Sequence, residues 1–345
     1  MMKLLILTTL FGISLACGSH GDCKSCADHG GCFWDLGAKK CKSILLQPFV
    51  NKANVIPKAL SCPTALPAFQ YTDDFGRNTA LVFTMASNGE GETAAQTCIT
   101  NRIPNAQVHK QYTVNCDWVG SSCSATVFLH PDANAVVLAF RGTKGATQFF
   151  IETINLIIAA SSTGPYYNGR VFTYFSKAFG LLWGSGLASD LSTLLQENPN
   201  AELWIFGHSL GGSLATLAGN AAVRQGFITG DRVRVVTMGE PRTGDYDFAA
   251  DVGTNIPQTY RIVKQTDLVT KMPLKLSLEQ TNAYHNNFEV WYNNDMSVGS
   301  SFAVNNRADD YSGSNTVNYD GSDSHNSYFN VDMDTYQQQG CPAQA

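Results

Sequence analysis

The sequence predicts an α/β fold in which helices flank a mostly parallel central sheet, preceded by a small N-terminal disulfide-rich module. Two observations support this prediction. Apolar runs at 135–140, 203–206, 232–238 and 258–264 alternate with helical patterns such as 171–195, as in chains that build parallel sheets. Five of the ten cysteines lie within the first 41 residues. We therefore expect a stapled N-terminal unit followed by one larger α/β domain.

Residues 1–16 are typical of a secretory signal peptide. Lys3 provides a basic start, and the apolar run from Leu4 to Ala16 ends in small residues suited to cleavage. The alternative is a membrane anchor, but the run is shorter than the about 20 residues that a spanning helix needs. We therefore expect a secreted protein without a transmembrane anchor, in an extracellular, lysosomal or gut-lumen compartment.

The composition bounds the size of the core and the class of partner. Of the 345 residues, 44% are hydrophobic and 15% are charged, so residues 63–345 can form one large α/β domain. The formal charge is −5, and loss of Lys3 with the signal peptide makes it −6. This mild acidity gives no reason to expect a nucleic-acid partner.

The N-terminal cysteines predict a module over residues 17–62, which is too short to bury much core without cross-links. In an exported chain they indicate disulfide bonds, with Phe33 and Trp34 as the module's core. The Cys23-x-x-Cys26 spacing also fits zinc, but no second pair with metal-ligand spacing follows. We therefore expect disulfides and no metal site. No protein partner of this module can be inferred.

Two further cysteine pairings are expected in the larger domain. Cys116 and Cys123 are close enough in sequence to close a short loop, and Cys341 must pair upstream, with Cys62 as the candidate. The polar stretch 305–326, rich in Asp, Ser, Asn and Gly, is a loop by composition.

The stretch that organises the domain is 201–212, with sequence AELWIFGHSLGG. Its apolar run reads as a buried strand and leads directly into G-x-S-x-G around Ser209, the pattern of a nucleophile elbow. Small residues then allow a helix to pack closely on the sheet until Gly226 ends it. The alternative is an incidental Gly/Ser loop, but the strand before and helix after the motif favour the elbow.

Several segments together resemble the class 3 lipase family, which includes secreted fungal triacylglycerol lipases with the α/β-hydrolase fold. The segments are FRGT at 140–143, GHSLGG at 207–212, GEPRTGD at 239–245, YRIVKQTDLVTKMP at 260–273, YHNNFEVWY at 284–292 and DSHNSYF at 323–329. The resemblance covers about 70–329 and leaves out the cysteine-rich start. Thr270 departs from the family pattern, where proline is common, and Asn287 departs where glycine is common.

Acyl transfer needs a nucleophile, a base and a carboxylate that holds the base. With Ser209 as nucleophile, the chain order on this fold is Ser, then Asp or Glu, then His. Spacing leaves both His285 and His325 open as the base. The resemblance implies Asp267 and His325 as the partners and a structural role for His285. Other acidic residues after Ser209 are expected to be solvated loop charges: Glu240, Asp245, Asp247 and Asp251.

The oxyanion hole is expected to take one donor from the amide of Leu210, the residue after the nucleophile. The resemblance implies Thr143 as the second donor, and Arg141 is expected to brace this loop. His208 is expected to point away from the reaction. No metal or organic cofactor is expected.

Residues 145–160 predict an amphipathic helix, with Glu152, Thr153 and Asn155 mainly on its polar face. The expected lid and substrate-contact residues are Phe149, Phe150, Ile154, Ile157 and Ile158. The alternative is an ordinary core helix. In the resembling lipases this segment is a lid, and an apolar lid suits an oil–water interface.

The sequence hypothesis is a secreted serine carboxylester hydrolase, a triacylglycerol lipase that acts on a lipid ester at an interface. Alternatives are a phospholipase or a short-chain or feruloyl-type esterase on the same triad. A non-catalytic lipid-binding protein of the same fold is a further alternative, which the presence of Ser209, Asp267 and His325 disfavours.

Overall fold

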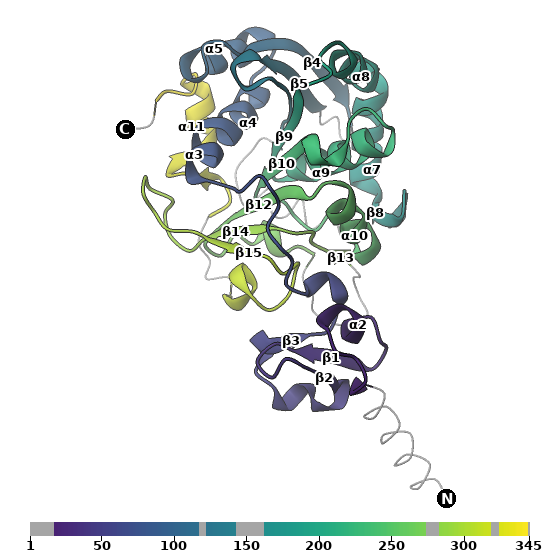
Figure 1. Cartoon of the computed structure of the whole chain (residues 1–345). Helices are drawn as coiled ribbons and strands as arrows, with labels where there is room; N and C mark the ends of the chain where they lie inside the picture. Colours follow the sequence, from purple (N-terminus) through teal and green to yellow (C-terminus); the bar gives the residue numbers. More distant parts are fainter. Residues whose placement is uncertain (1–16, 117–121, 143–161, 274–282, 319–323, 344–345) are drawn as a thin grey trace, which may run out of the picture.

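The computed structural model describes residues 17–116, 122–142, 162–273, 283–318 and 324–343. Figure 1 shows a large body of strands and helices with the small N-terminal unit attached to one end of it. The predicted signal peptide, Thr143 and the predicted lid lie outside the described residues. Within the described residues, no helix has the length and apolar character that crossing a bilayer requires.

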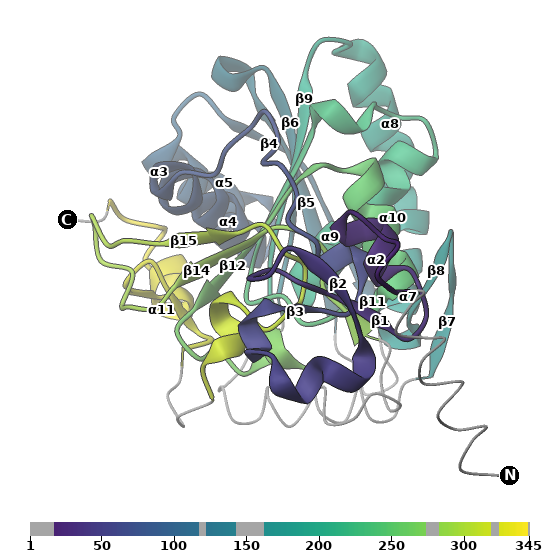
Figure 2. The same cartoon turned by 60° about the horizontal axis from the view of Figure 1, so that its bottom comes forward.

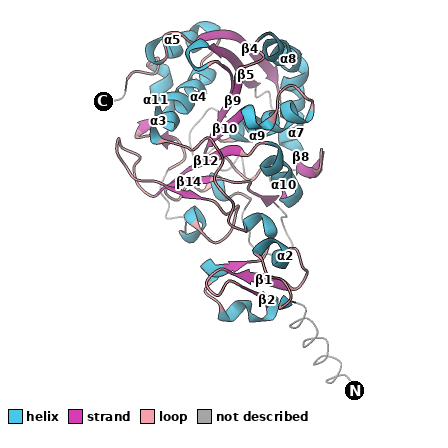
Figure 3. Ribbon diagram, in the orientation of Figure 1, coloured by secondary structure: helices cyan, strands magenta, loops and turns pink. Residues whose placement is uncertain are grey.

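An eight-stranded sheet forms the centre of the body. In sheet order its strands are β15 (Ala303–Asn305), β14 (Glu289–Tyr292), β12 (Gln258–Lys264), β10 (Val233–Met238), β9 (Glu202–His208), β6 (Ala135–Phe140), β5 (Ser122–His130) and β4 (Gln107–Asn115). The five strands from β14 to β6 are parallel, and antiparallel strands close both edges. The predicted fold class, a mostly parallel sheet flanked by helices, is confirmed (Figure 3).

Helices cover both faces of this sheet (Figure 2). One face carries α3 (Asp73–Phe75), the π-helix η4 (Gly76–Ala80), α4 (Leu81–Asn88), α5 (Glu92–Arg102) and α11 (Met333–Gln338). The other carries α7 (Thr173–Leu182), the π-helix η6 (Trp183–Leu187), α8 (Ala188–Glu197), α9 (Leu210–Arg224) and α10 (Tyr246–Asn255). Alternate residues of β9 enter the two cores: Leu203 and Ile205 pack on one side, Trp204 and Phe206 on the other. Burial on both faces explains why the parallel strands are continuous apolar runs.

Short elements complete the body. A second sheet has the order β13 (Ala283–Tyr284), β11 (Gly244–Asp245), β8 (Gly169–Phe172) and β7 (Thr163–Tyr166), and a hairpin pairs β16 (Ser327–Tyr328) with β17 (Val331–Asp332). Short helical turns are η5 (Pro131–Ala133), η7 (Gly230–Arg232), η8 (Val269–Lys271) and η9 (Gly313–Thr316). The helical pattern predicted from 171 begins two residues late, because Val171 and Phe172 belong to β8. The Gly184-Ser185-Gly186 stretch predicts a break in this helix, and the break occurs at Gly186, whose φ is +104°.

The N-terminal unit is a three-stranded sheet, β2-β1-β3, surrounded by short helices. Its elements are α2 (Cys23–Ala27), β1 (Cys32–Asp35), β2 (Lys40–Ser43), η1 (Ile44–Phe49), η2 (Lys52–Asn54), β3 (Val55–Ile56) and η3 (Ala59–Ser61). Phe33 and Trp34 are buried in it as predicted. Three disulfides staple it: Cys17–Cys32, Cys23–Cys62 and Cys26–Cys41.

The predicted disulfides are therefore present, with one pairing corrected. Both cysteines of the Cys23-x-x-Cys26 motif are oxidised, so neither supplies a thiolate for zinc. Cys116 pairs with Cys123 as expected. The expected Cys341–Cys62 bond is wrong, because Cys341 pairs with Cys98 of α5. The C-terminus lies beside α5 and α11, at the end of the body away from the N-terminal unit (Figure 1).

Candidate functional site

Ser209 occupies the sharp bend between β9 and α9. Its backbone has φ 59° and ψ −127°, a left-handed conformation that is strained for a residue with a side chain. The first turn of α9 follows at once, so helix amides surround the bend. Ser209 is completely buried, and its Oγ has no hydrogen-bond partner among the described residues. A buried hydroxyl without a partner is uncommon in proteins and is a candidate functional group.

The glycines of the G-x-S-x-G motif make this bend possible. A Cβ at Gly211 would lie 2.6 Å from the carbonyl oxygen of Phe140 and 2.9 Å from that of Arg141. A Cβ at Gly207 would collide with the backbone of Gly211 itself. Close approach of backbones is therefore the reason for glycine at both positions. The guanidinium of Arg141 donates to the carbonyl of Ser122 at 2.6 Å and braces the end of β6, whereas the loop that it is expected to brace lies outside the described residues.

Asp267 and His325 form a buried hydrogen-bonded pair. Asp267 lies in the turn between β12 and η8, and His325 lies just before the hairpin that begins with β16. The Nδ1 of His325 is 2.9 Å from Oδ2 and 3.0 Å from Oδ1 of Asp267. The carboxylate also accepts from the hydroxyl of Tyr328 at 2.7 Å and from the amide of Val269 at 3.0 Å. Three donors thus make four contacts with the carboxylate and fix its orientation.

These neighbours also hold the carboxyl group in its charged form. Burial by itself raises the pKa of Asp267, but the His325 imidazole and the Tyr328 hydroxyl outweigh burial, so its pKa falls from the ordinary value. Burial raises the pKa of the Tyr328 hydroxyl well above its usual range, and the adjacent Asp267 carboxylate raises it further, so this hydroxyl stays a donor. The arrangement suits a carboxylate that orients an imidazole.

Close backbone contacts bring this pair to the Ser209 bend. The amide of Ser209 donates to the carbonyl of Met238 at the end of β10, at 2.8 Å. The next residue, Gly239, has φ +63°, and a Cβ there would lie 2.7 Å from Cε1 of His325 and 3.1 Å from Oδ2 of Asp267. The bend, the imidazole and the carboxylate therefore meet at the carboxyl ends of β9, β10 and β12, where open α/β sheets bind ligands.

His208, the residue before the bend, contacts the backbone of the candidate base. Its Nε2 donates to the carbonyl oxygen of His325 at 2.9 Å, and the two ring centroids are 4.5 Å apart. Burial, reinforced by the nearby His325, lowers the pKa of His208 to about 3. A neutral imidazole in this position supports the loop that carries His325.

His285, the alternative base, lies in a different hydrogen-bond network. Its Nε2 donates to the carbonyl of Thr270 at 2.7 Å, and its backbone amide donates to Asp309 at 3.1 Å. Burial, followed by the nearby Arg261 charge, lowers the pKa of His285 well below its usual range. Its ring is thus held as a neutral structural donor.

The sequence prediction for the other acidic residues is wrong for two of them. Glu240 is buried and accepts hydrogen bonds from Thr216, Thr237 and Thr243 at 2.7–3.0 Å. Burial raises its pKa although the three hydroxyls oppose the shift. Asp251 is buried against Arg224 of α9. Neither is a solvated loop charge, because the surrounding helices exclude water from both.

The polar stretch 305–326 contains an anchor that its composition does not reveal. The guanidinium of Arg242 donates from Nε and Nη2 to the two oxygens of Asp309, at 2.8 and 2.7 Å, and both side chains are buried. The same guanidinium donates to the carbonyls of Lys271 and Pro273 in the loop after Asp267. This ion pair therefore connects the polar stretch to the loop that carries the candidate carboxylate. Arginine suits this position because its guanidinium donates two parallel hydrogen bonds to one carboxylate.

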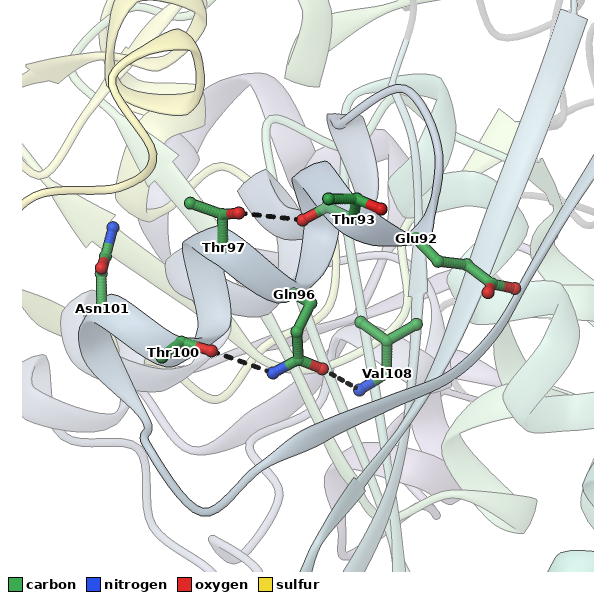
Figure 4. A pocket seen from close by; sticks show the side chains of 7 residues that line it. All are labelled: Glu92, Thr93, Gln96, Thr97, Thr100, Asn101 and Val108. Carbon is green, nitrogen blue, oxygen red and sulfur yellow. Dashed lines mark hydrogen bonds between the residues drawn. The ribbon is translucent and has the colours of Figure 1, made fainter.

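An open hollow of about 480 Å³ lies elsewhere, along α5 (Figure 4). Its side chains largely bond one another or nearby backbone: Gln96 contacts the hydroxyl of Thr100 at 3.1 Å and the amide of Val108 at 2.8 Å. Among the residues that line it, Glu92 is the one ionisable group, and no nucleophile–base pair is present. The hollow therefore does not offer an alternative catalytic centre.

Comparison with known proteins agrees with the geometry. A family described as lipase (class 3) matches residues 137–277. Lipase ZK262.3 of Caenorhabditis elegans is 27% identical over 264 residues, 69% of this chain and 73% of that protein. Secreted mono- and diacylglycerol lipase A of Penicillium camembertii is 27% identical over 171 residues, covering 47% of this chain and 52% of its own. Phospholipase A(1) DAD1 of Arabidopsis thaliana is 30% identical over 151 residues, which are 40% of this chain and 33% of that protein.

Two solved structures have the same fold. The lipase from Rhizopus microsporus var. chinensis superposes with a TM-score of 0.63 at 19% identity, covering 77% of this chain and 90% of that one. The triacylglyceride lipase of Rhizomucor miehei has a TM-score of 0.61 at 20% identity, and the match covers 76% of this chain and 97% of that one. The α/β-hydrolase fold predicted through the resemblance is confirmed.

Proposed function

The chain belongs to the class 3 lipase family and is an ester hydrolase; from this premise we propose that it is a secreted triacylglycerol lipase with Ser209 as its nucleophile. The observation that carries the proposal is the buried Ser209 hydroxyl, which lacks a partner among the described residues beside a hydrogen-bonded His–Asp pair. Along the chain, Ser209, Asp267 and His325 follow one another in the order of nucleophile, carboxylate and base that this fold uses.

The reaction proceeds in two half-reactions. Ser209 Oγ attacks the ester carbonyl carbon as its proton moves to Nε2 of His325, while Asp267 holds the Nδ1–H and stabilises the imidazolium. The tetrahedral intermediate then releases the alcohol, which takes that proton, and leaves an acyl group on Ser209. Water repeats the sequence with His325 as base and frees the fatty acid. The chemistry requires no metal or organic cofactor.

The developing oxyanion is stabilised by backbone donors. The amide of Leu210 opens α9 and therefore has no acceptor within the helix, so it is available to the substrate. Thr143 is the proposed second donor. Each such donor is worth about 2.7–4 kcal/mol in the transition state.

The substrate class is inferred from the predicted lid and from the relatives. The apolar side chains of Phe149, Phe150, Ile154, Ile157 and Ile158 suit a surface that opens at an oil–water interface. The similarity to a protein named as a phospholipase A(1) favours a phospholipid ester as the second candidate substrate.

The compartment follows from the cysteines and the relatives. Five disulfide bonds and the similarity to secreted lipases support an extracellular protein. Neither the disulfide bonds nor the secreted relatives favour a lysosome or a gut lumen as the compartment. Cleavage of residues 1–16 and a separate module at 17–62 belong to the same proposal.

Replacement of the nucleophile tests the proposal. Ser209→Ala should lower kcat for ester hydrolysis by a factor on the order of 10⁶. Ser213→Ala is the matched control, because Ser213 is a buried serine on the same helix and bonds Thr243 rather than the candidate base. Full activity in Ser209→Ala would refute the assignment. Rates on emulsified triacylglycerol, phospholipid vesicles and a dissolved short ester then rank the substrates.

A further inference from the structure

The N-terminal unit exposes an unusual concentration of large apolar side chains. Phe49 is 85% exposed, Leu45 51%, Leu46 45% and Ile44 37%, and all four lie in the six-residue helix η1. They account for four of the nine large apolar side chains that are exposed in the described part of the chain. Single exposed apolar residues are normal on proteins, whereas a cluster of this kind marks a contact surface.

The backbone of this apolar helix is held in place. Ser43 caps its first turn by accepting from the amide of Leu45, and Asn51 accepts from the amide of Ala53 just after it. The amide of Ile44 donates to the carbonyl of Gly31 at 2.8 Å, beside the disulfide of Cys32. The side chains are thus presented from a fixed backbone, which reduces the ordering that binding would require.

The charge of the unit is opposite to that of the body. Residues 17–62 contain six lysines and three aspartates, a net charge of +3, whereas residues 63–345 contain 16 basic and 25 acidic residues, a net charge of −9. Lys39 and Lys40 are exposed in the β1–β2 hairpin and have no ion pair with a described residue. Leu36 at this turn donates to the carbonyl of Asn54, so the turn lies close to the end of η2, which follows η1. In the sequence, Lys40 and Lys42 precede η1 and Lys52 follows it, so lysines flank the apolar helix.

The patch lies on a unit that is connected to the candidate site. Arg307 donates to the carbonyl of Ala53 at 3.0 Å, and the ammonium of Lys52 lies 4.1 Å from the ring centroid of Tyr311. Farther along the same segment, the carbonyl of Ser314 accepts from Lys271, four residues after Asp267, at 2.9 Å. Figure 2 shows the purple helical turns of η1 and η2 at the lower edge of the molecule.

We propose that η1, with Ile44, Leu45, Leu46 and Phe49, is a lipid-surface anchor that seats the enzyme on an anionic interface. An exposed apolar wedge flanked by lysines is the pattern of a segment that enters the headgroup region of a membrane. The anionic charge of this interface is that of acidic phospholipids. This inference rests on the proposed lipase function, because it assigns the surface on which that site works, and the anchor acts separately from the predicted lid.

Vesicle binding by the full secreted chain tests the anchor. The double variant Leu45→Ser/Phe49→Ser should weaken binding to phosphatidylcholine vesicles that contain phosphatidylglycerol by about tenfold for each apolar side chain removed. Leu181→Ser is the matched control, since Leu181 is 49% exposed on α7 and lies outside the N-terminal unit. Unchanged vesicle binding in the double variant would overturn the proposal.

The charge contribution has its own variant. Lys39→Gln/Lys40→Gln should weaken binding to the anionic vesicles by about fivefold per lysine and leave binding to pure phosphatidylcholine nearly unchanged. An equal loss of binding to both vesicle types would show that the lysines do not interact with the negative surface charge. That result would contradict the choice of an anionic partner.

Two further measurements separate this inference from the proposed function. Hydrolysis of a dissolved short ester should be the same in wild type and in the η1 variants, whereas hydrolysis of emulsified lipid should fall with vesicle binding. Absence of turnover on any ester would refute the proposed function but not the anchor. If gel filtration shows a wild-type dimer that the double variant disrupts, while vesicle binding is unchanged, a second copy covers the patch and the proposal is wrong.

Discussion

The described part of the chain contains two buried carboxylate–histidine groups, which differ in what each carboxylate and each imidazole contacts. In the first, Asp267 bonds the Nδ1 of His325 directly, and the ring stands next to the Ser209 bend. In the second, Asp309 is bonded by the guanidinium of Arg242, and the ring of His285 donates to a backbone carbonyl. Burial and charge are common to both. The first group differs because its carboxylate bonds an imidazole ring. That ring lies beside the Ser209 hydroxyl, which has no hydrogen-bond partner among the described residues.

The largest expected effect separates the two histidines. His325→Ala should lower kcat by a factor on the order of 10⁶ while the protein stays folded, because the base is lost. His285→Ala should retain the rate per folded molecule and lose about 1–3 kcal/mol of stability, because the carbonyl of Thr270 loses its donor. Kinetics together with denaturant unfolding measures both. Inactivity confined to His285→Ala would exchange the two roles.

The orienting carboxylate is expected to contribute less. Asp267→Asn should lower kcat by about 10⁴, because an amide at this position favours the wrong tautomer of His325. A loss of less than tenfold in a folded variant would mean that Asp267 is a structural acid.

A substitution in the second group, which contains Asp309, should change the free energy of unfolding rather than the reaction rate. Asp309→Asn leaves the buried Arg242 charge without its counter-ion, and we expect a loss of about 3–5 kcal/mol in the free energy of unfolding. Lys110→Gln, which breaks the exposed pair with Asp190, should cost less than about 1 kcal/mol. Similar small losses in both variants would contradict the view that Asp309 anchors the polar stretch.

Tyr328→Phe should have a smaller effect on the reaction. It removes one donor to the charged Asp267, worth about 1.5–3 kcal/mol. The pKa of Asp267 is lowered in the folded protein, so its contribution to stability is present at neutral pH and is lost as the pH falls through that lowered value. Loss of the Tyr328 hydroxyl raises this pKa, so the acid limb of stability and activity should move to higher pH. An acid limb that does not move would exclude this role.

The effect that is smallest at neutral pH concerns His208. Its pKa is about 3 in the folded protein against 6.5 for the free side chain, so the unfolded chain binds one more proton between these values. Stability therefore falls as the pH drops from 6.5 toward 3, by up to about 1.4 kcal/mol per pH unit from this residue. His208→Gln keeps a donor for the carbonyl of His325 and should flatten the slope. A slope equal to that of wild type would show that His208 does not titrate in this way.

The comparison also shows which features the sequence could predict. Apolar runs and glycine positions depend on local sterics, so the strands, the Ser209 bend and the break at Gly186 could be predicted. The choice of Asp267 and His325 came from family resemblance, because spacing alone left His285 open. Their catalytic roles remain predictions.

Long-range packing could not be predicted. Glu240 and Asp309 have no local signal of burial, because Thr216 and Arg242, which donate to them, come from other segments of the chain. Cys341 bonds Cys98 across a separation of 243 residues, since α11 packs against α4 and brings the C-terminus to α5. Composition likewise predicted a loop at 305–326, and the ion pair of Arg242 with Asp309 shows that polar composition does not mean weak attachment.

The most direct test is covalent labelling of the nucleophile by an alkylphosphonate p-nitrophenyl ester, located by peptide mass spectrometry. We predict one phosphonyl group on Ser209 in the wild-type protein, with labelling slowed severely in His325→Ala and retained in His285→Ala. A label on another residue, or labelling of Ser209 that does not depend on His325, would contradict the central claim that His325 activates the Ser209 hydroxyl.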